Sequence, residues 1–534
     1  MSRAILAIFV VLAATVAVPS PADELAPADK PIEEVVDHYI DAKFADAEVN
    51  PAEQADEANL MRRLMLDLAG RIPAAVEVRE YLDSDDSDKR AKLIDRLMDS
   101  QEFADHMAGQ FDTMLMADTD GSVRDYLKTA FQENRKWDRM FRELLLPKQS
   151  DETLKSAADF VKRRANDADK LTTDVSALFF GVNVSCAKCH DHPEVSDWSQ
   201  DYFYGMKSFF NRTFENGGFI AERPFGLVKY TTTEGEERDA RLMFLTGTVL
   251  DESEYKVPNP DEQKKIDERF KQLAKKKQAP PEPEYSRRAR LVEIALKPDQ
   301  NAVFGRAIVN RLWHQFVGYG LVMPLDQMHV ENPPSHPRLL KWLARDLTSH
   351  NYDLRRLIRG LVLSKTYSRG SRWETAKRPR RSYFSVANLR PLTPLQYARS
   401  LSLATADPQK FQDDMPLEER QKRIAEAAGS GNSNQFEQPR ENFRVTADEA
   451  LFFSNSDQVV NSYLKGGLFQ RLKSEADKKQ MIEAAVWSIY SRAVTEEETK
   501  ILSDYLLKRT DRQETACRQL IWALLTSTEF RFNY

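Results

Sequence analysis

The chain has 534 residues, of which 41% are hydrophobic and 30% are charged, a composition typical of a soluble, globular protein. Its 77 basic and 83 acidic residues give a net charge of −6, which argues against nucleic acid as a partner. A chain of this length is expected to bury at least one large core and to fold as two or three domains.

The first 22 residues have the pattern of a secretory signal peptide. Arg3 provides the positive start, residues 4–18 form an apolar segment, and Ser20-Pro21-Ala22 offers small residues for cleavage near Ala22. We therefore expect the mature protein to be exported, to the periplasm or to the cell surface. No later run of about eighteen apolar residues predicts a membrane span.

Residues 30–215 are predicted to be helical, because apolar residues recur at helical spacing between polar breaks. Within this region, residues 66–103 share a pattern with residues 487–530, and a shorter echo lies at residues 358–367. The corresponding positions are Arg71 and Arg492, and Ser100-x-Glu102-Phe103 and Ser527-x-Glu529-Phe530. Duplication and convergent helix-end sequences both explain this similarity, and either way the segments are predicted to pack rather than to catalyse.

Chemistry is concentrated at Cys186-Ala187-Lys188-Cys189-His190, which holds two of the three cysteines in the spacing of covalent haem attachment. Two thiols three residues apart can reach the two vinyl groups of one porphyrin, and the adjacent imidazole then lies under the iron. We therefore predict haem c on Cys186 and Cys189, with His190 as the proximal iron ligand. Export agrees with this prediction, since c-type haem is attached outside the cytoplasm.

Three alternatives to haem remain open for this motif: a disulfide or redox pair, a divalent metal ion, and two buried thiols. A metal ion would need ligands from elsewhere, because the neighbours Cys189 and His190 point apart. Lone histidines and methionines are more often structural than ligating. The further candidates for ligation or for the surroundings of a metal are Asp191, His192, His336 and Met206, followed by His314, Met323 and Met328.

Beyond the motif, residues 216–260 are predicted to form a small β-rich insert, in which residues 227–233 pair with residues 241–250 around a turn at Glu234-Gly235. Residues 261–285 are charged and proline-rich, which predicts a linker and a domain boundary. Helical periodicity resumes over residues 286–534. The predicted fold class is mainly α, a multi-helical chain in two parts that dock, with a small β-hairpin insert.

The segment from Arg355 to Arg390 is strongly basic and holds a single acid, Glu374. Such a segregation of charge favours an anionic partner, here an anionic polysaccharide or an envelope component. The alternative is internal, because the acidic residues 33–57 would also cover a basic surface. The predicted anion patch comprises Lys377, Arg378, Arg380 and Arg381.

Several segments resemble a secreted family best known from planctomycetes, which has paired domains of unknown function, DUF 1549 and DUF 1553. The segments that carry the resemblance are 66–71 and 186–193 in the first part, 301–322 and 332–343 in the second, and 522–533 at the end. The resemblance assigns residues 30–215 to the first domain and residues 286–534 to the second. It implies no defined activity.

The sequence contains no Ser-His-Asp order, P-loop or dinucleotide fingerprint, so whether the protein is an enzyme stays open. The leading hypothesis is a c-type haem protein related to electron transfer. The alternatives are an exported metal-dependent hydrolase acting on polysaccharide or another polymer, and a non-catalytic envelope or assembly protein.

Overall fold

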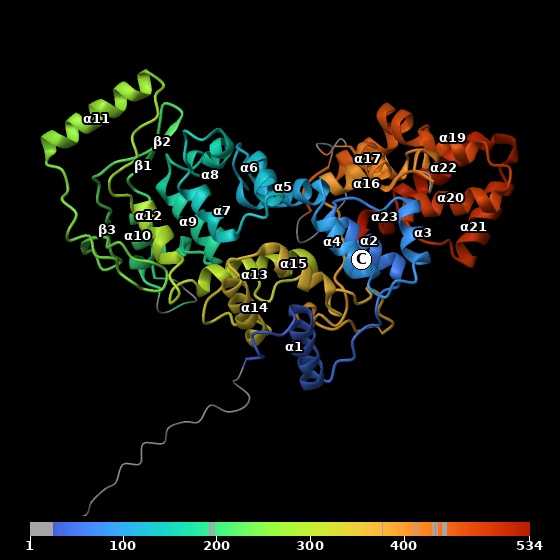
Figure 1. Ribbon diagram of the computed structural model, residues 1–534, viewed down its shortest axis with the longest axis horizontal. Helices are drawn as coiled ribbons and strands as arrows, with labels where there is room; N and C mark the ends of the chain where they lie inside the picture. Colours follow the sequence, from blue (N-terminus) through green and yellow to red (C-terminus); the bar gives the residue numbers. More distant parts are fainter. Residues whose placement is uncertain are drawn as a thin grey trace, which may run out of the picture.

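The computed structural model describes residues 25–191, 195, 198–375, 377–411, 414–429, 433, 436–439 and 446–534. These residues are mainly α-helical and carry three small two-stranded sheets, which confirms the predicted fold class (Figure 1). No helix among them is long and apolar enough to cross a membrane. The predicted signal peptide and His192 lie outside the described residues.

The first part of the chain is a succession of short helices. They are α1 (Ile32–Ala47), α2 (Glu57–Leu68), α3 (Ala75–Asp83), α4 (Lys89–Met98), α5 (Gln101–Leu115), α6 (Arg124–Gln132), α7 (Trp137–Leu145), α8 (Asp159–Lys162), α9 (Ala168–Phe180) and α10 (Gln200–Ser208). Asp56 begins α2 by accepting a hydrogen bond from the amide of Asn59, the usual work of an N-cap. Gly181 ends α9 with φ 67°, a conformation that favours glycine, and turns the chain into the cysteine motif.

The β-rich insert differs from the prediction. β1 (Thr213–Asn216) pairs with β2 (Phe219–Glu222), and β3 (Lys229–Thr231) pairs with β4 (Glu237–Asp239), both antiparallel. The predicted partner of residues 227–233, residues 241–250, is therefore wrong. Backbone hydrogen bonds of Thr232 with Gly235 and Glu236 form a tight turn, so the strand that pairs with β3 begins directly after it, at Glu237. The apolar run at 242–245 is buried in the core instead.

Most of the segment predicted to be a linker is a helix, α11 (Pro260–Lys275). Asn259 and Glu262 form a capping box at its start, and Pro260 occupies the first turn. Phe270 is its buried residue and packs edge-on against Phe214 of β1, with 5.2 Å between ring centroids. The charges that suggested a linker therefore cover the solvent side of a helix that rests on the insert.

The second part is again helical. Its elements are α12 (Arg287–Ala295), α13 (Ala302–Val317), α14 (Pro337–Ser349), α15 (Leu354–Leu363), β5 (Arg390–Pro391), α16 (Pro394–Ala404), α17 (Leu417–Ala428), α18 (Ala447–Asn455), α19 (Gly467–Lys473), α20 (Lys478–Tyr490), α21 (Glu496–Leu507), α22 (Gln513–Leu525), α23 (Thr528–Arg531) and β6 (Phe532–Asn533). The short strands β5 and β6 pair with each other, which ties the end of the chain to the middle of the second part.

Two hydrophobic cores hold the molecule, and both combine the two parts of the chain. In the larger core, Trp137 of α7 stacks on Phe304 of α13, with 6.1 Å between ring centroids. In the smaller core, Leu66 and Ile72 pack among residues of 392–530. Figure 1 accordingly shows α2 and α3 beside the helices of the C-terminal end. The prediction that the two parts dock is confirmed, because neither core is complete without the other part.

The sequence repeat corresponds to two copies of one helical unit, α2 to the start of α5 and α20 to α23. In each copy the first helix ends at a residue with positive φ, Gly70 (72°) or Ser491 (61°). In each copy a serine, Ser100 or Ser527, caps the last helix by accepting from the amide three residues later. The shorter echo shares this cap alone, at Ser364. The copies touch where the Ser491 hydroxyl donates to the carbonyl of Pro73.

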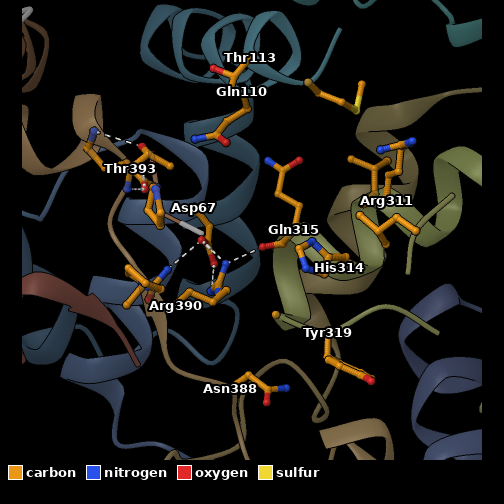
Figure 2. A pocket seen from close by; sticks show the side chains of 18 of the residues that line it. Asp67, Gln110, Thr113, Arg311, His314, Gln315, Tyr319, Asn388, Arg390 and Thr393 are labelled. Atoms are coloured by element: carbon orange, nitrogen blue, oxygen red, sulfur yellow. Dashed lines mark hydrogen bonds and ion pairs between the residues drawn. The ribbon is translucent and has the colours of Figure 1, made fainter. Parts of the chain in front are cut away.

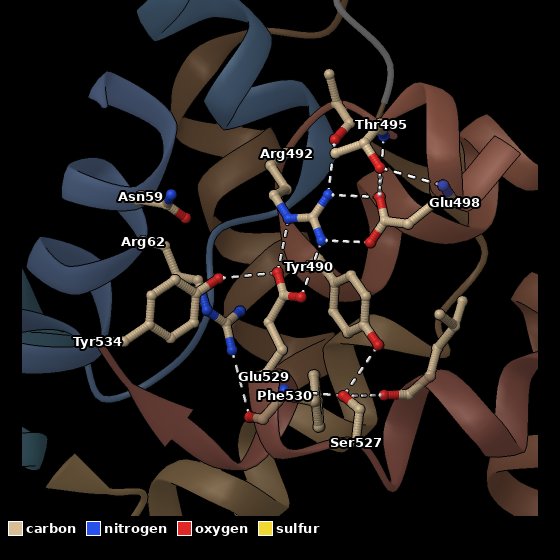
Figure 3. Close-up of polar contacts among 12 residues, drawn as sticks. Asn59, Arg62, Tyr490, Arg492, Thr495, Glu498, Ser527, Glu529, Phe530 and Tyr534 are labelled. Atoms are coloured by element: carbon tan, nitrogen blue, oxygen red, sulfur yellow. Dashed lines mark hydrogen bonds and ion pairs between the residues drawn. The ribbon is translucent and has the colours of Figure 1, made fainter. Parts of the chain in front are cut away.

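One arginine between two glutamates closes each copy, and Figure 3 shows the second copy. Arg492 donates to Glu529 from Nε at 2.6 Å and to Glu498 from Nη1 at 2.9 Å. Arg71 makes the same pattern, from Nε to Glu102 at 2.6 Å and from Nη1 to Glu77 at 2.8 Å. The copies differ in burial, since the Arg71 side chain is 1% exposed and that of Arg492 is 18% exposed.

Acid is expected to weaken the second copy. The hydrogen bond from Arg492 lowers the pKa of Glu498 from 4.5 to about 2. A carboxylate with a depressed folded-state pKa contributes stability above its unfolded-state pKa, and this contribution is lost as the pH falls toward 2. Between pH 4.5 and 2 the unfolding free energy of the wild type should therefore fall, and that of Arg492→Met should fall less. Urea denaturation at several pH values measures both. Equal pH dependence in variant and wild type would contradict this assignment.

The basic segment is partly neutralised inside the fold. Four of its arginines form ion pairs with carboxylates of the first part: Arg355–Asp99, Arg359–Asp95, Arg369–Asp41 and Arg390–Asp67. Asp37 of α1 also accepts hydrogen bonds from the backbone amides of Lys365 and Thr366. Of these carboxylates, Asp37 and Asp41 belong to the acidic residues 33–57 that were expected to cover the basic surface, whereas Asp67, Asp95 and Asp99 do not. Within the described residues, no ion pair involves the exposed side chains of the predicted anion patch, Lys377, Arg378, Arg380 and Arg381.

Candidate functional site

The cysteine motif lies on an exposed turn between α9 and α10. Cys186 belongs to the 3₁₀ helix η3 (Ser185–Lys188), and the amide of Cys189 donates to the carbonyl of Cys186 at 3.4 Å. This hydrogen bond brings the backbones of Cys186 and Cys189 together across one turn. Both thiols are exposed, and no disulfide joins them. The thiols are therefore accessible to a ligand or a modifying group.

His190 stands at the end of this turn and is also exposed. Its Nδ1 lies 2.7 Å from the backbone oxygen of Asp191. This contact favours the tautomer with hydrogen on Nδ1, which leaves the lone pair of Nε2 for a metal. The Asp191 carboxylate accepts from the amide of Gln200 at 3.2 Å, so it fixes the turn to the start of α10.

The turn is held from two sides. The carbonyl of Lys188 accepts from the Tyr204 hydroxyl of α10 at 3.1 Å, and its ammonium pairs with Asp169 of α9 at 2.8 Å. Tyr204 in turn stacks on Tyr230 of β3, with 4.2 Å between ring centroids. The backbone of the motif is therefore positioned by neighbouring elements, although its reactive side chains are exposed.

A segment of the second part pairs with the chain just before the motif. The amide of Asn183 donates to the carbonyl of Asp326 at 2.7 Å, and the amide of Met328 donates to the carbonyl of Gly181 at 2.9 Å. A side chain at Gly181 would collide with the Met328 thioether. His329, whose ring lies 6.0 Å from that of Trp198, comes to the same region. Sequence reasoning missed His329, because its position depends on a pairing between residues far apart in the chain.

Two of the other predicted ligands are buried. His336 precedes α14, its Nδ1 lies 3.1 Å from the Ser335 hydroxyl, and its ring contacts Phe384. Burial lowers the pKa of His336 to about 4. Met206 is fully buried in the larger core. Across the described part of the chain, no three His, Cys, Asp or Glu side chains are grouped to hold a metal ion.

A second candidate site is a cavity of about 770 Å³ between the two parts of the chain. Figure 2 shows Gln110 and Thr113 of α5 on one side and Arg311, His314 and Gln315 of α13 on another. Residues around β5 and residues of the C-terminal strand β6 also line the cavity. Cavities at such junctions, with an apolar wall and a few polar groups, are common ligand sites.

Asp67 anchors one wall of this cavity. Its carboxylate makes a two-pronged ion pair with Arg390, at 2.8 and 2.7 Å, and accepts from Asn533 and from the Tyr367 hydroxyl, each at 2.8 Å. The side chain of Asp67 is 5% exposed. Because these partners follow α15 or belong to β5 and β6, Asp67 of α2 ties together the segments that enclose the cavity.

The two histidines of the cavity are neutral at pH 7. Burial lowers the pKa of His106 to about 3 and that of His314 to about 4, and nearby guanidinium groups add to both effects. His314, considered from sequence as an iron ligand, thus lines this cavity. The positive charge of the site comes from its arginines. No pattern in the sequence indicated that Arg311 lies near the arginines of the basic segment.

The chain matches two protein-family models, and both agree with the resemblance seen in the sequence. Residues 35–215 match the family model PSCyt2, a protein of unknown function (DUF1549), and residues 287–442 match PSD1, a protein of unknown function (DUF1553). The cysteine turn lies within the first match, and both matches contribute to the cavity. No curated protein and no solved structure matches the chain.

Proposed function

We propose that this protein, with its DUF1549 and DUF1553 regions in tandem, is an exported c-type haem protein with a role related to electron transfer. The observation that supports the proposal best is the cysteine turn. It presents two exposed thiols across one turn, followed by an imidazole whose Nδ1 is engaged by a backbone oxygen. These residues fit the attachment of a porphyrin.

Each residue of the turn has a distinct part in this proposal. Cys186 and Cys189 would hold haem through thioether bonds, and Nε2 of His190 would bind its iron. The carbonyl of Asp191 orients the imidazole through Nδ1–H. Haem bound there would supply one-electron chemistry. Tyr204 and Asp169 hold the backbone of the turn through Lys188.

Export of the full chain from a bacterial host that matures c-type cytochromes tests the proposal. We expect one haem per chain, with a Soret band that survives acid-acetone extraction. Cys186→Ala and Cys189→Ala each remove one thioether bond and together abolish retention, whereas His190→Ala keeps the haem and shifts its spectrum. Cys517→Ala is the matched control, because Cys517 is fully buried and burial raises the pKa of its thiol to about 11.

A colourless wild-type protein from this host would contradict the proposal. Metal analysis of the same preparation then separates the remaining hypotheses. Stoichiometric zinc or calcium that is lost in His190→Ala would favour the metal-dependent hydrolase. A metal-free protein with a disulfide between Cys186 and Cys189 would favour the non-catalytic envelope protein.

A further inference from the structure

Of the four arginines that line the cavity, Arg390 is paired with Asp67, and no ion pair within the described residues involves the other three. Arg311 donates from Nη2 to the carbonyl of Ala177 at 2.7 Å and from Nε to that of Leu178 at 3.1 Å, at the end of α9. Arg378 and Arg381, at residues predicted as an anion patch, also line the cavity. The Arg311 guanidinium is therefore held by neutral acceptors.

The two arginines from the patch are fixed in the same way. Arg381 donates to the Asn388 side chain at 3.1 Å and to the carbonyl of Gly318 at 3.0 Å, and its guanidinium lies over the Tyr319 ring. Arg378 donates to the carbonyl of Ala387 at 2.8 Å. Such fixed cations lose little conformational freedom when an anion binds.

Positive charge is in excess among the described residues that line the cavity. Asp67 is its acidic lining residue and is already paired with Arg390. Burial lowers the pKa of Arg311 to about 10, which still leaves this side chain protonated at neutral pH. Arg311 is desolvated without an ion pair, and Arg378 and Arg381 add two exposed positive charges beside it, so these three guanidinium groups favour an anion from outside the chain.

The remaining lining indicates what kind of anion fits. Amide and hydroxyl groups of Gln110, Thr113 and Gln315 line the cavity, and Figure 2 shows Gln110 and Gln315 approaching its centre from different helices. Phe111 and Leu312 add apolar surface between these polar groups. Alternating hydroxyl-binding and apolar surface suits a sugar ring, and a volume of about 770 Å³ accommodates a short oligosaccharide.

We propose that this cavity binds a short acidic saccharide. Its carboxylate or sulfate ester pairs with Arg311, Arg378 and Arg381, and its hydroxyls meet Gln110 and Gln315. The proposal is independent of the cysteine turn, because none of the residues that line the cavity belongs to that turn. Binding is therefore testable whether or not haem is attached.

Isothermal titration calorimetry with the exported full chain tests this site. The probes are trigalacturonate, a sulfated carrageenan oligosaccharide without carboxylates, and neutral maltotriose. We expect at least one acidic probe to bind and maltotriose not to bind measurably, and the comparison of the two acidic probes identifies the anionic group. Binding of maltotriose as tightly as the acidic probes, or no binding of either acidic probe, would overturn the proposal.

Two double variants locate the site. Arg378→Gln/Arg381→Gln and Lys377→Gln/Arg380→Gln each remove two positive charges from the same exposed stretch, but only the first pair lines the cavity. We expect the first to weaken binding at least about ten-fold and the second less than about two-fold. Gln110→Glu, which adds a carboxylate on the opposite helix, should also weaken binding about ten-fold and serves if the first double variant unfolds. Equal losses in both double variants, or unchanged binding in Gln110→Glu, would place binding on the outer surface and refute the cavity.

Discussion

Replacing Asp67 by alanine is expected to lower the free energy of unfolding by about 3–5 kcal/mol, because it leaves Arg390 without its counter-charge and the buried donors Tyr367 and Asn533 without their acceptor. The carboxylate accepts from Arg390 twice, from Tyr367 and from Asn533, and it is 5% exposed. Removing it unpairs donors from three segments at once. Urea denaturation followed by circular dichroism measures the loss.

Asp95→Ala is the matched control for this measurement. Asp95 makes the same two-pronged contact with an arginine, Arg359, at 2.7 and 3.1 Å. Its side chain is 50% exposed, however, and water competes with such a pair, so the expected loss is about 1 kcal/mol or less. If Asp67→Ala and Asp95→Ala lowered the free energy of unfolding by similar amounts, burial would not be the reason why the Asp67 ion pair stabilises the fold.

Arg71→Met is expected to destabilise the protein by about 3–5 kcal/mol, and Arg492→Met by about 1–2 kcal/mol. The two arginines donate to equivalent glutamates in the two copies of the repeat, so hydrogen bonding alone predicts equal effects. They differ in exposure, 1% for Arg71 and 18% for Arg492. Loss of Arg71 therefore leaves carboxylates with less access to water. Unfolding free energies at pH 7 measure both changes.

The comparison has a control within each copy. Glu77→Gln and Glu498→Gln remove the equivalent charge from the partner side while keeping the shape, and each should destabilise less than replacement of its arginine, because the second glutamate of each copy remains paired. Equal losses in Arg71→Met and Arg492→Met would contradict this prediction, because they would show that the difference in burial between the two arginines does not affect stability.

The sequence by itself determined the fold class, the place of the cysteine motif and the repeat. Helical spacing, N-caps such as Ser100 and Ser527, and the glycine after α9 act over a few residues, so they can be recognised locally. The correspondence of Arg71 with Arg492 was also visible, because both copies preserve the same order of residue types. Local composition was misleading for α11, where a charged surface suggested a linker.

Only the tertiary structure decided which distant segments meet. Asp67 pairs with Arg390 and Asn533, and Gly181 pairs with Met328, across intervals in which no local pattern specifies a partner. The acidic first helix neutralises Arg369 but not Arg378 or Arg381, which line the cavity instead. Local periodicity decides which face of a helix is buried, but the choice of partner depends on how all the apolar faces pack together. The cavity, its arginines and the exposure of the cysteine motif therefore emerged from the structure, whereas the motif itself was recognised in the sequence.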